Sequence, residues 1–203
     1  MDTQYDFGSG ELCLDFANTN DWHASENPQE RLHDYLDLII WGEGAGLLAA
    51  ERADRLRRLA ARLPEEASAA YERAIELREA LFRIFTAISN GSQVEKKDLA
   101  ILNTALDSAL GHQEITNSPG GFAWSWDDDP DLERVVWPVA RSAADLLTSD
   151  LLSRVRRCED DRGCGYLFID TSRNRSRRWC SMESCGNRAK ARRHYARQKD
   201  HTD

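Results

Sequence analysis

The stretch CEDDRGCGYLFIDTSRNRSRRWCSMESC, residues 158–185, decides how the C-terminal part of this 203-residue chain folds. It holds four of the five cysteines in the spacing C-x5-C-x15-C-x4-C, namely Cys158, Cys164, Cys180 and Cys185. In a reducing compartment such a group favours a metal over disulfides, and four thiolates suit a tetrahedral zinc ion. Because four protein ligands close the coordination sphere, the spacing predicts one structural Zn²⁺; four buried, unligated thiols are the alternative.

Charge divides the chain into two parts. The net charge is −8, but residues 1–150 hold 13 Lys/Arg and 28 Asp/Glu, whereas residues 151–203 hold 14 and 7. An acidic body with a basic end predicts two functional units, 1–150 and 151–203, and an anionic partner for the second. Hydrophobic residues make up 41% of the chain, which excludes a wholly disordered protein.

Several function classes have no support in the sequence. No apolar run approaches the ~20 residues of a membrane-spanning helix, and residues 1–13 carry acids and no apolar signal-peptide core. The sequence therefore predicts a cytoplasmic protein without a membrane partner. A P-loop, a dinucleotide-binding glycine motif, HExxH and G-x-S-x-G are all missing, so we expect no enzyme activity.

The first 150 residues predict a mainly α fold with small β elements. Apolar residues at three- and four-residue spacing predict five helices: from Pro28 to the glycines at 42–46, 47–63, 65–88, 99–110, and 131–152 with a kink at Pro138. Alternation over Leu12–Phe16 predicts a short strand, on whose more polar face Cys13 would be a free thiol. Residues 113–116 and 122–126 flank a turn-rich link and predict a hairpin.

The basic C-terminal part predicts a zinc finger. Residues 153–157 and 165–169 are expected to pair as a hairpin with the first two cysteines near its turn, and residues 186–199 to form a helix. Trp179 is expected to pack over the metal site. No linker rich in Pro, Gly or Ser precedes the cysteines, so the finger is expected to pack on the last helix of the body.

The finger also carries the candidate nucleic-acid contacts. The expected helix is basic on two opposite flanks, which fits a groove with phosphates on both walls, and arginine forks suit phosphates and base edges. DNA is the expected partner and RNA stays open. The candidate residues are Arg173, Arg175, Arg177, Arg178, Arg188, Lys190, Arg192, Arg193 and Arg197.

Two resemblances extend this interpretation. The run LFIDTSRNRSRRWCSMESCGNRAKARRHYAR, residues 167–197, resembles the CGNR zinc finger, whose tetrapeptide stands at Cys185–Arg188. GELCLDFANT (10–19), LREALFRIFTAISNG (77–91), DLAILNTAL (98–106) and PVARSAADLL (138–147) resemble the ABATE domain that accompanies this finger. The resemblances imply a zinc-bound finger and a stress-induced transcription regulator of bacteria. In such a regulator the helical part could sense a ligand, dimerise or contact the transcription machinery.

Other hypotheses stay open at this point. The finger could be a zinc-stapled protein-interaction module whose basic face binds an acidic partner, or the chain's own acidic body. The helical part could dimerise. Arg78 and Arg83, among the apolar positions of their helix, could bind a small anionic effector or extend to the helix edge.

Overall fold

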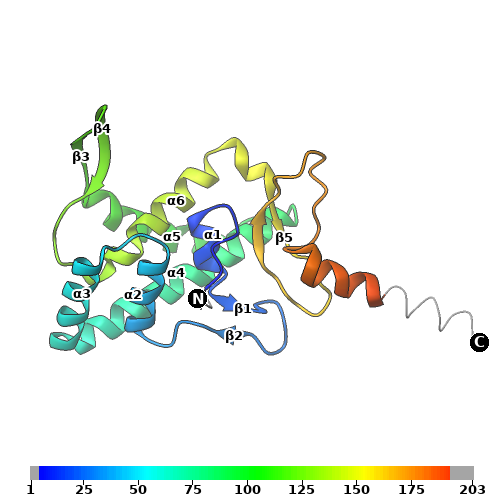
Figure 1. The fold of residues 1–203 in the computed structure, drawn as a ribbon, viewed down its shortest axis with the longest axis horizontal. Coiled ribbons are helices and arrows are strands. Elements are labelled where there is room, and N and C mark those ends of the chain that lie inside the picture. The colour runs from blue at the N-terminus through cyan, green and yellow to red at the C-terminus, as the bar shows by residue number, and fades with distance from the viewer. Residues whose placement is uncertain (1–4, 193–203) are drawn as a thin grey trace, which may run out of the picture.

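The computed structural model describes residues 5–192, and most of these residues are helical (Figure 1). The helices of this part are α1 (Leu12–Ala17), α2 (Tyr35–Gly44), α3 (Ala50–Arg62), α4 (Pro64–Ser89), α5 (Lys96–Gly111) and α6 (Trp137–Leu147), with 3₁₀ turns η1 (Leu132–Val135) and η2 (Asp150–Arg154) on either side of α6. The strands form antiparallel pairs: β1 (Asn20–Asp21) with β2 (Gln29–Glu30), β3 (Gln113–Ser118) with β4 (Gly121–Trp126), and β5 (Val155–Arg157) with β6 (Leu167–Ile169). None of the helices within residues 5–192 combines the length and apolarity needed to cross a membrane.

Helix α4 runs through the middle of the body and contacts helices α1, α2, α3 and α5 as well as strands β5 and β6 (Figure 1). Pro64 begins it, because a proline in the first helical turn loses no hydrogen bond. Small and apolar residues then recur at three- and four-residue intervals and bury one face: Ala67, Ala70, Ala74, Leu77, Leu81, Ile84 and Phe85. One helix thus supports both the body and the strand pair next to the cysteines.

The strand predicted at Leu12–Phe16 is wrong, because these residues belong to helix α1. Residues 13–17 are all buried, and α1 packs against both α4 and α6. Alternation marks a strand only where one face is exposed, and a helix buried on nearly all sides has no such face. Cys13 is therefore a free but fully buried thiol, and this burial raises its pKa to about 12.

Two other predicted boundaries also differ from the structure. Asn27–Pro28 begins no helix; α2 begins after Asp34, whose side chain accepts hydrogen bonds from the N–H groups of Leu36 (2.8 Å) and Asp37 (3.0 Å). A helix starts where its free N–H groups find acceptors, and Asp34 supplies one. Pro138 lies in the first turn of α6 instead of kinking a longer helix.

The remaining predicted elements are confirmed, with ends shifted by a few residues. Helices α3, α4 and α5 and the hairpin β3–β4 all lie where periodicity and turn residues predict them. The fold class, mainly α with small β elements and a C-terminal cysteine-rich finger, is likewise confirmed.

The strand pair β5–β6 belongs to the core of the helical body. Val155 lies opposite Ile169 in the pair, and both side chains are buried with Leu167 in the same apolar cluster as the helices. The side chain of Asn18 donates to the C=O of Leu167 and accepts from its N–H, both at 2.8 Å, while the N–H of Ile169 donates to the C=O of Ser9 (2.8 Å). The strands pack mainly on α4 and α1, and the preceding turn η2 contacts α6, the last helix of the body.

Candidate metal centre

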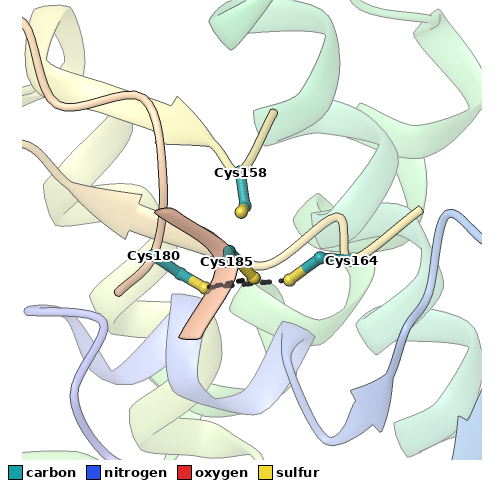
Figure 2. A group of neighbouring side chains, drawn as sticks. All are labelled: Cys158, Cys164, Cys180 and Cys185. Atoms are coloured by element: carbon teal, nitrogen blue, oxygen red, sulfur yellow. Dashed lines mark hydrogen bonds between the residues drawn. The ribbon is translucent and has the colours of Figure 1, made fainter. Parts of the chain in front are cut away.

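The four cysteines of the C-terminal part come together in one cluster (Figure 2). Their sulfur atoms all lie within 4.8 Å of one another. The separation is 3.5 Å between Cys180 and Cys185 and 3.7 Å between Cys164 and Cys180. Cys158 points toward the other three from the end of β5, and none of the four is in a disulfide.

This arrangement fits a zinc ion. Four sulfurs at about 2.3 Å from a tetrahedral Zn²⁺ lie about 3.8 Å from one another, close to the observed separations. Hydrogen bonds from Cys164 and Cys180 lower the pKa of Cys158, and the same contacts raise the pKa of those two thiols. The cluster therefore favours one thiolate and opposes more negative charge, which a divalent cation offsets. The cysteines thus form a closed site for one structural zinc.

The first two cysteines lie on either side of a tight loop. The N–H of Cys158 donates to the C=O of Tyr166 (2.8 Å), which extends the pairing of β5 and β6 by one step. Before Cys164, Gly163 has a φ of +87°, and a Cβ there would lie 2.5 Å from the Cα of Ser25. Only glycine fits this position without displacing the backbone of the helical body. The loop that carries Cys164 therefore rests directly on the body.

The second pair of cysteines lies at the start of the last helix. Cys180 follows the basic loop, and Cys185 lies within the π-helical turn Met182–Gly186. The side chain of Ser181 caps this turn by accepting a hydrogen bond from the N–H of Ser184 (3.3 Å). Residues 187–192 then continue as α-helix, the described part of the helix expected over 186–199.

A buried carboxylate, that of Asp160, holds this helix against the loop between Cys158 and Cys164. The side chain of Asp160 is 0% exposed and accepts hydrogen bonds from Arg188 (3.3 Å), Arg192 (3.2 Å) and the N–H of Arg162 (3.1 Å). Burial opposes ionisation of Asp160, but hydrogen bonds from the backbone and the side chain of Arg162 hold its pKa below the usual range. Arg188 also donates to the sulfur of Cys185 at 2.9 Å, which places positive charge beside the thiolate cluster.

The loop between β6 and Cys180 is held in shape by hydrogen bonds to a buried carboxylate. The carboxylate of Asp170, which is fully buried, accepts hydrogen bonds from the N–H groups of Ser172 (2.8 Å) and Arg177 (2.9 Å). The guanidinium of Arg177 lies 4.4 Å from the centre of the Phe168 ring and donates to the C=O of Trp179 (3.0 Å). Arg177 therefore helps to hold the loop together.

The other candidate nucleic-acid residues divide into groups by their contacts. Those that hydrogen-bond acids of the finger are Arg178, Arg188 and Arg192, with Glu159, Asp160 and Asp161 as acceptors. Those that are exposed and form no ion pair within residues 5–192 are Arg173, Arg175 and Lys190. Arg193 and Arg197 lie outside the described residues.

Trp179 packs where it was expected. It is partly buried against the cluster of Cys158, Phe168 and Cys185, and the guanidinium of Arg178 lies 5.2 Å from its ring centre. Its ring therefore covers one side of the metal site.

Sequence reasoning missed the residues of the helical body that touch the finger. Asn18 binds β6, and Trp22 lies between the guanidinium groups of Arg162 (5.0 Å) and Arg188 (5.3 Å). Trp22 has a φ of +55°, a conformation that a bulky residue rarely adopts. The partners of both residues are about 140 or more positions away, and no sequence signal of the single chain connects them.

The two arginines of α4 that could bind an anionic effector are both paired with acids. Arg78 is 2% exposed and binds both carboxylate oxygens of Glu30 (2.5 and 2.7 Å) and the carboxylate of Glu79 (2.8 Å). The expectation that Arg78 extends to the helix edge is therefore wrong, and its charge is already neutralised. Arg83 does reach outward and pairs with the buried Asp98 at 2.7 Å.

The fold and the metal site define a helical protein that carries a four-cysteine zinc finger. Comparison with family models supports this class: residues 154–198 match the CGNR zinc finger. Residues 10–150 match the ABATE model, described as "Putative stress-induced transcription regulator", and the chain belongs to this family. A comparison with curated proteins found no match.

Proposed function

We propose that this chain is a zinc-dependent DNA-binding transcription regulator whose finger contacts the phosphate backbone. One observation carries the proposal: Arg173 and Arg175 are exposed and lack an acidic partner within residues 5–192, although the chain has a net charge of −8. Acids are plentiful, and they pair with neighbouring arginines of the finger. A guanidinium left without a carboxylate is suited to a phosphate oxygen pair.

The conformation of the loop supports this role. Arg175 has a φ of +50°, a left-handed conformation that costs free energy for a residue other than glycine. The loop is held in this shape by the bonds to Asp170 and by the hydroxyl of Ser172, which accepts from the N–H of Ser176 (3.2 Å). Its two arginines are thus presented by a preorganised backbone, which reduces the entropy cost of binding.

The zinc site connects the basic loop to the helix that carries Lys190. It fixes Cys180 at the end of the loop and Cys185 at the start of the helix, where Lys190 is exposed. Zinc binding would therefore set the distance between the loop and helix cations. On this proposal the protein acts by binding and not by catalysis, in the bacterial cytoplasm, under stress, and the helical body senses a signal.

The test is a selection of zinc-loaded full-length protein against random duplex DNA and random RNA at near-physiological salt. We expect enrichment of duplex DNA, and a weaker affinity for the double variant Arg173→Ala/Arg175→Ala. Because each phosphate contact contributes about 0.9 to the log–log salt slope, the variant's slope should fall by about 2.

The matched control is Arg58→Ala, which removes an exposed cation of α3 and should change neither the affinity nor the salt slope. Failure of zinc-loaded protein to bind either polymer at low salt would contradict the proposal and leave the acidic-protein partner in its place. Enrichment of RNA alone would contradict DNA as the partner.

A further inference from the structure

The hairpin β3–β4 stands out from the helical body as an arm (Figure 1). Its register places Ile115 opposite Trp124 and Asn117 opposite Phe122, while Gln113 at the base lies opposite Trp126. Cross-strand partners share a face, and positions two apart on one strand share it too. The large apolar side chains of the arm therefore lie on one face.

This face is exposed to an unusual degree. The exposed fraction is 54% for Ile115, 61% for Trp124 and 78% for Phe122, whereas Trp126 at the base packs on the core with its ring 6.0 Å from that of Trp137. An apolar stripe thus begins in the core and continues along the arm into solvent. Isolated two-stranded hairpins are marginally stable in water, and large exposed apolar patches mark binding surfaces.

We propose that this face of the arm binds the same face of a second copy of the chain about a twofold axis. The stripe runs from Phe122 near the tip through the central pair Ile115 and Trp124 to Trp126 at the base. If two arms lie antiparallel, face to face, the tip of each meets the base of the other and the central pairs meet on the axis. In such a contact both copies use the same surface, so the assembly stops at the dimer.

The area available agrees with a small dimer. A buried Phe or Trp removes about 150–250 Å² from water, so the exposed parts of the three side chains supply roughly 300–400 Å² per copy. Two copies then bury about 600–800 Å² from these side chains alone, and the flanking strand surface adds to it. The area of these side chains lies below the roughly 1,200–2,000 Å² of stable specific interfaces, which predicts a weak, concentration-dependent dimer.

The charges near the arm argue against a nucleic acid on this face. Arg141, whose guanidinium lies 5.6 Å from the ring centre of Trp124, is already paired with Asp145 (2.9 Å). Arg52, Arg55 and Arg134 are paired in the same way with Asp127 and Asp128, which follow β4. These cations are therefore not free to bind a phosphate. Two acidic copies repel each other, but this repulsion is screened by salt while apolar burial is not.

Salt dependence therefore separates this inference from the proposed function. Dimerisation through the arm should strengthen as salt rises, whereas binding of a nucleic acid by the finger should weaken. A finger that binds no DNA would leave the dimer intact, and a monomer that binds DNA would overturn only the inference about the arm.

The experiment is sedimentation equilibrium of the zinc-loaded full chain over a range of protein and salt concentrations. We expect a monomer–dimer equilibrium, and at least a tenfold higher dissociation constant for Phe122→Ser/Trp124→Ser. The matched control, Thr116→Ser/Ala123→Ser, changes the opposite face of the same strands and should dimerise like the unchanged chain. Unchanged far-ultraviolet circular dichroism and zinc content would show that the variant is folded.

Two results would overturn the proposal. One is an unchanged chain that stays monomeric at millimolar concentration and high salt. The other is a double variant that is folded and dimerises as well as the unchanged chain.

Discussion

The helical body and the finger are held together by different means. The core of the body draws buried side chains from each of the helices α1 to α6, with Trp41, Phe85 and Trp137 among the largest. Within the same residues, the finger's own cluster has three buried members, Cys158, Phe168 and Cys185, of which two are metal ligands. Small units generally need a metal or disulfides because they bury too little apolar surface. The body is stabilised by burial, and the finger by zinc and charge pairs.

The difference does not coincide with the division by charge at residue 150. The pair β5–β6 lies on the basic side of that division, yet Val155 and Leu167 are buried in the core of the body. The part that depends on zinc is therefore the cysteine loop, the basic loop and the helix that follows. The strand pair anchors these segments to α4, and the metal determines their shape.

Removal of zinc should produce the largest effect, and it should unfold the finger while the helical body stays folded. A structural zinc of this kind contributes about 10–16 kcal/mol of binding free energy at neutral pH. After chelation we expect amide exchange protection to be lost in residues 158–166 and 170–192, while β6, α4 and α5 keep theirs. Hydrogen exchange with mass spectrometry measures both regions in one sample.

A matched pair of variants checks the same point. Cys180→Ser removes one ligand and should abolish zinc binding, whereas Cys13→Ala removes a buried thiol outside the cluster and should retain one zinc per chain. Equal loss of protection in the body and the finger after chelation would show that the two regions are not distinct.

Loss of the buried arginine of the body should be the next largest effect. Arg78→Met leaves the carboxylates of Glu30 and Glu79 without their partner, and breaking a buried pair typically costs about 3–5 kcal/mol. We expect the free energy of unfolding, measured with urea on the helical signal, to fall by this amount while the zinc content is unchanged. Arg58→Met, at an exposed position of α3, is the control and should cost less than about 0.5 kcal/mol. A drop of similar size in both variants would contradict the role of the buried cluster.

Asn18 tests the connection between the two regions. Its side chain makes two buried hydrogen bonds with Leu167, and Asn18→Ala leaves both backbone groups of that residue unpaired. Buried groups without partners cost about 1–3 kcal/mol each, so we expect a loss of about 2–6 kcal/mol in unfolding free energy. The affinity for zinc, measured by competition with a chelator, should fall as well because β6 precedes the cysteine-flanked basic loop.

The control for this variant is Asn103→Ala on the exposed side of α5, which should change neither quantity. If Asn18→Ala lowered the stability of the body but left the zinc affinity unchanged, the finger would be energetically independent of the N-terminal segment.

The sequence predicts those features whose signal lies within a short window. The helices α3, α4 and α5 follow from apolar periodicity, the arm β3–β4 from its turn residues, and the metal site from the spacing of four cysteines. Each of these signals lies within a few neighbouring residues and does not depend on the tertiary contacts of the segment. Helix α1 was missed because its surroundings bury it on nearly all sides.

Side-chain direction could not be predicted. Charge counting places Arg177 and Arg188 in one basic surface with Arg173, but the first two are turned toward carbonyls, Asp160 and a cysteine sulfur. A count of charges gives the number of cations and not their partners, which depend on tertiary contacts such as that between Arg188 and Asp160. The structure was needed to identify the three candidate cations that are exposed and form no ion pair within residues 5–192, namely Arg173, Arg175 and Lys190.

The smallest expected effect concerns acid, which should destabilise the two regions for different reasons. Burial opposes ionisation of Glu79, but its contacts with His23 (2.8 Å) and Arg78 (2.8 Å) lower its pKa from the usual 4.5 to about 2. A group whose pKa is lower in the folded state stabilises the fold fully above pH 4.5, and this contribution is lost as the pH falls toward 2. The body should therefore lose stability in that window, whereas the finger loses zinc because its thiolates bind protons.

Glu79→Gln isolates the contribution of the body. Since the side chain is 30% exposed, we expect this variant to be less stable than the unchanged chain by about 1–2 kcal/mol at pH 6. The difference should shrink at pH 3, because Glu79 is then protonated in the unfolded chain but still largely ionised in the folded one, so that unfolding takes up a proton. Loss of zinc affects both proteins equally and cancels in the difference, so urea unfolding followed on the helical signal suffices. Glu72→Gln, exposed on the same helix, should show no such pH dependence. A difference that stayed constant from pH 6 to pH 3 would mean that Glu79 acts through its shape and hydrogen bonds, and not through its charge.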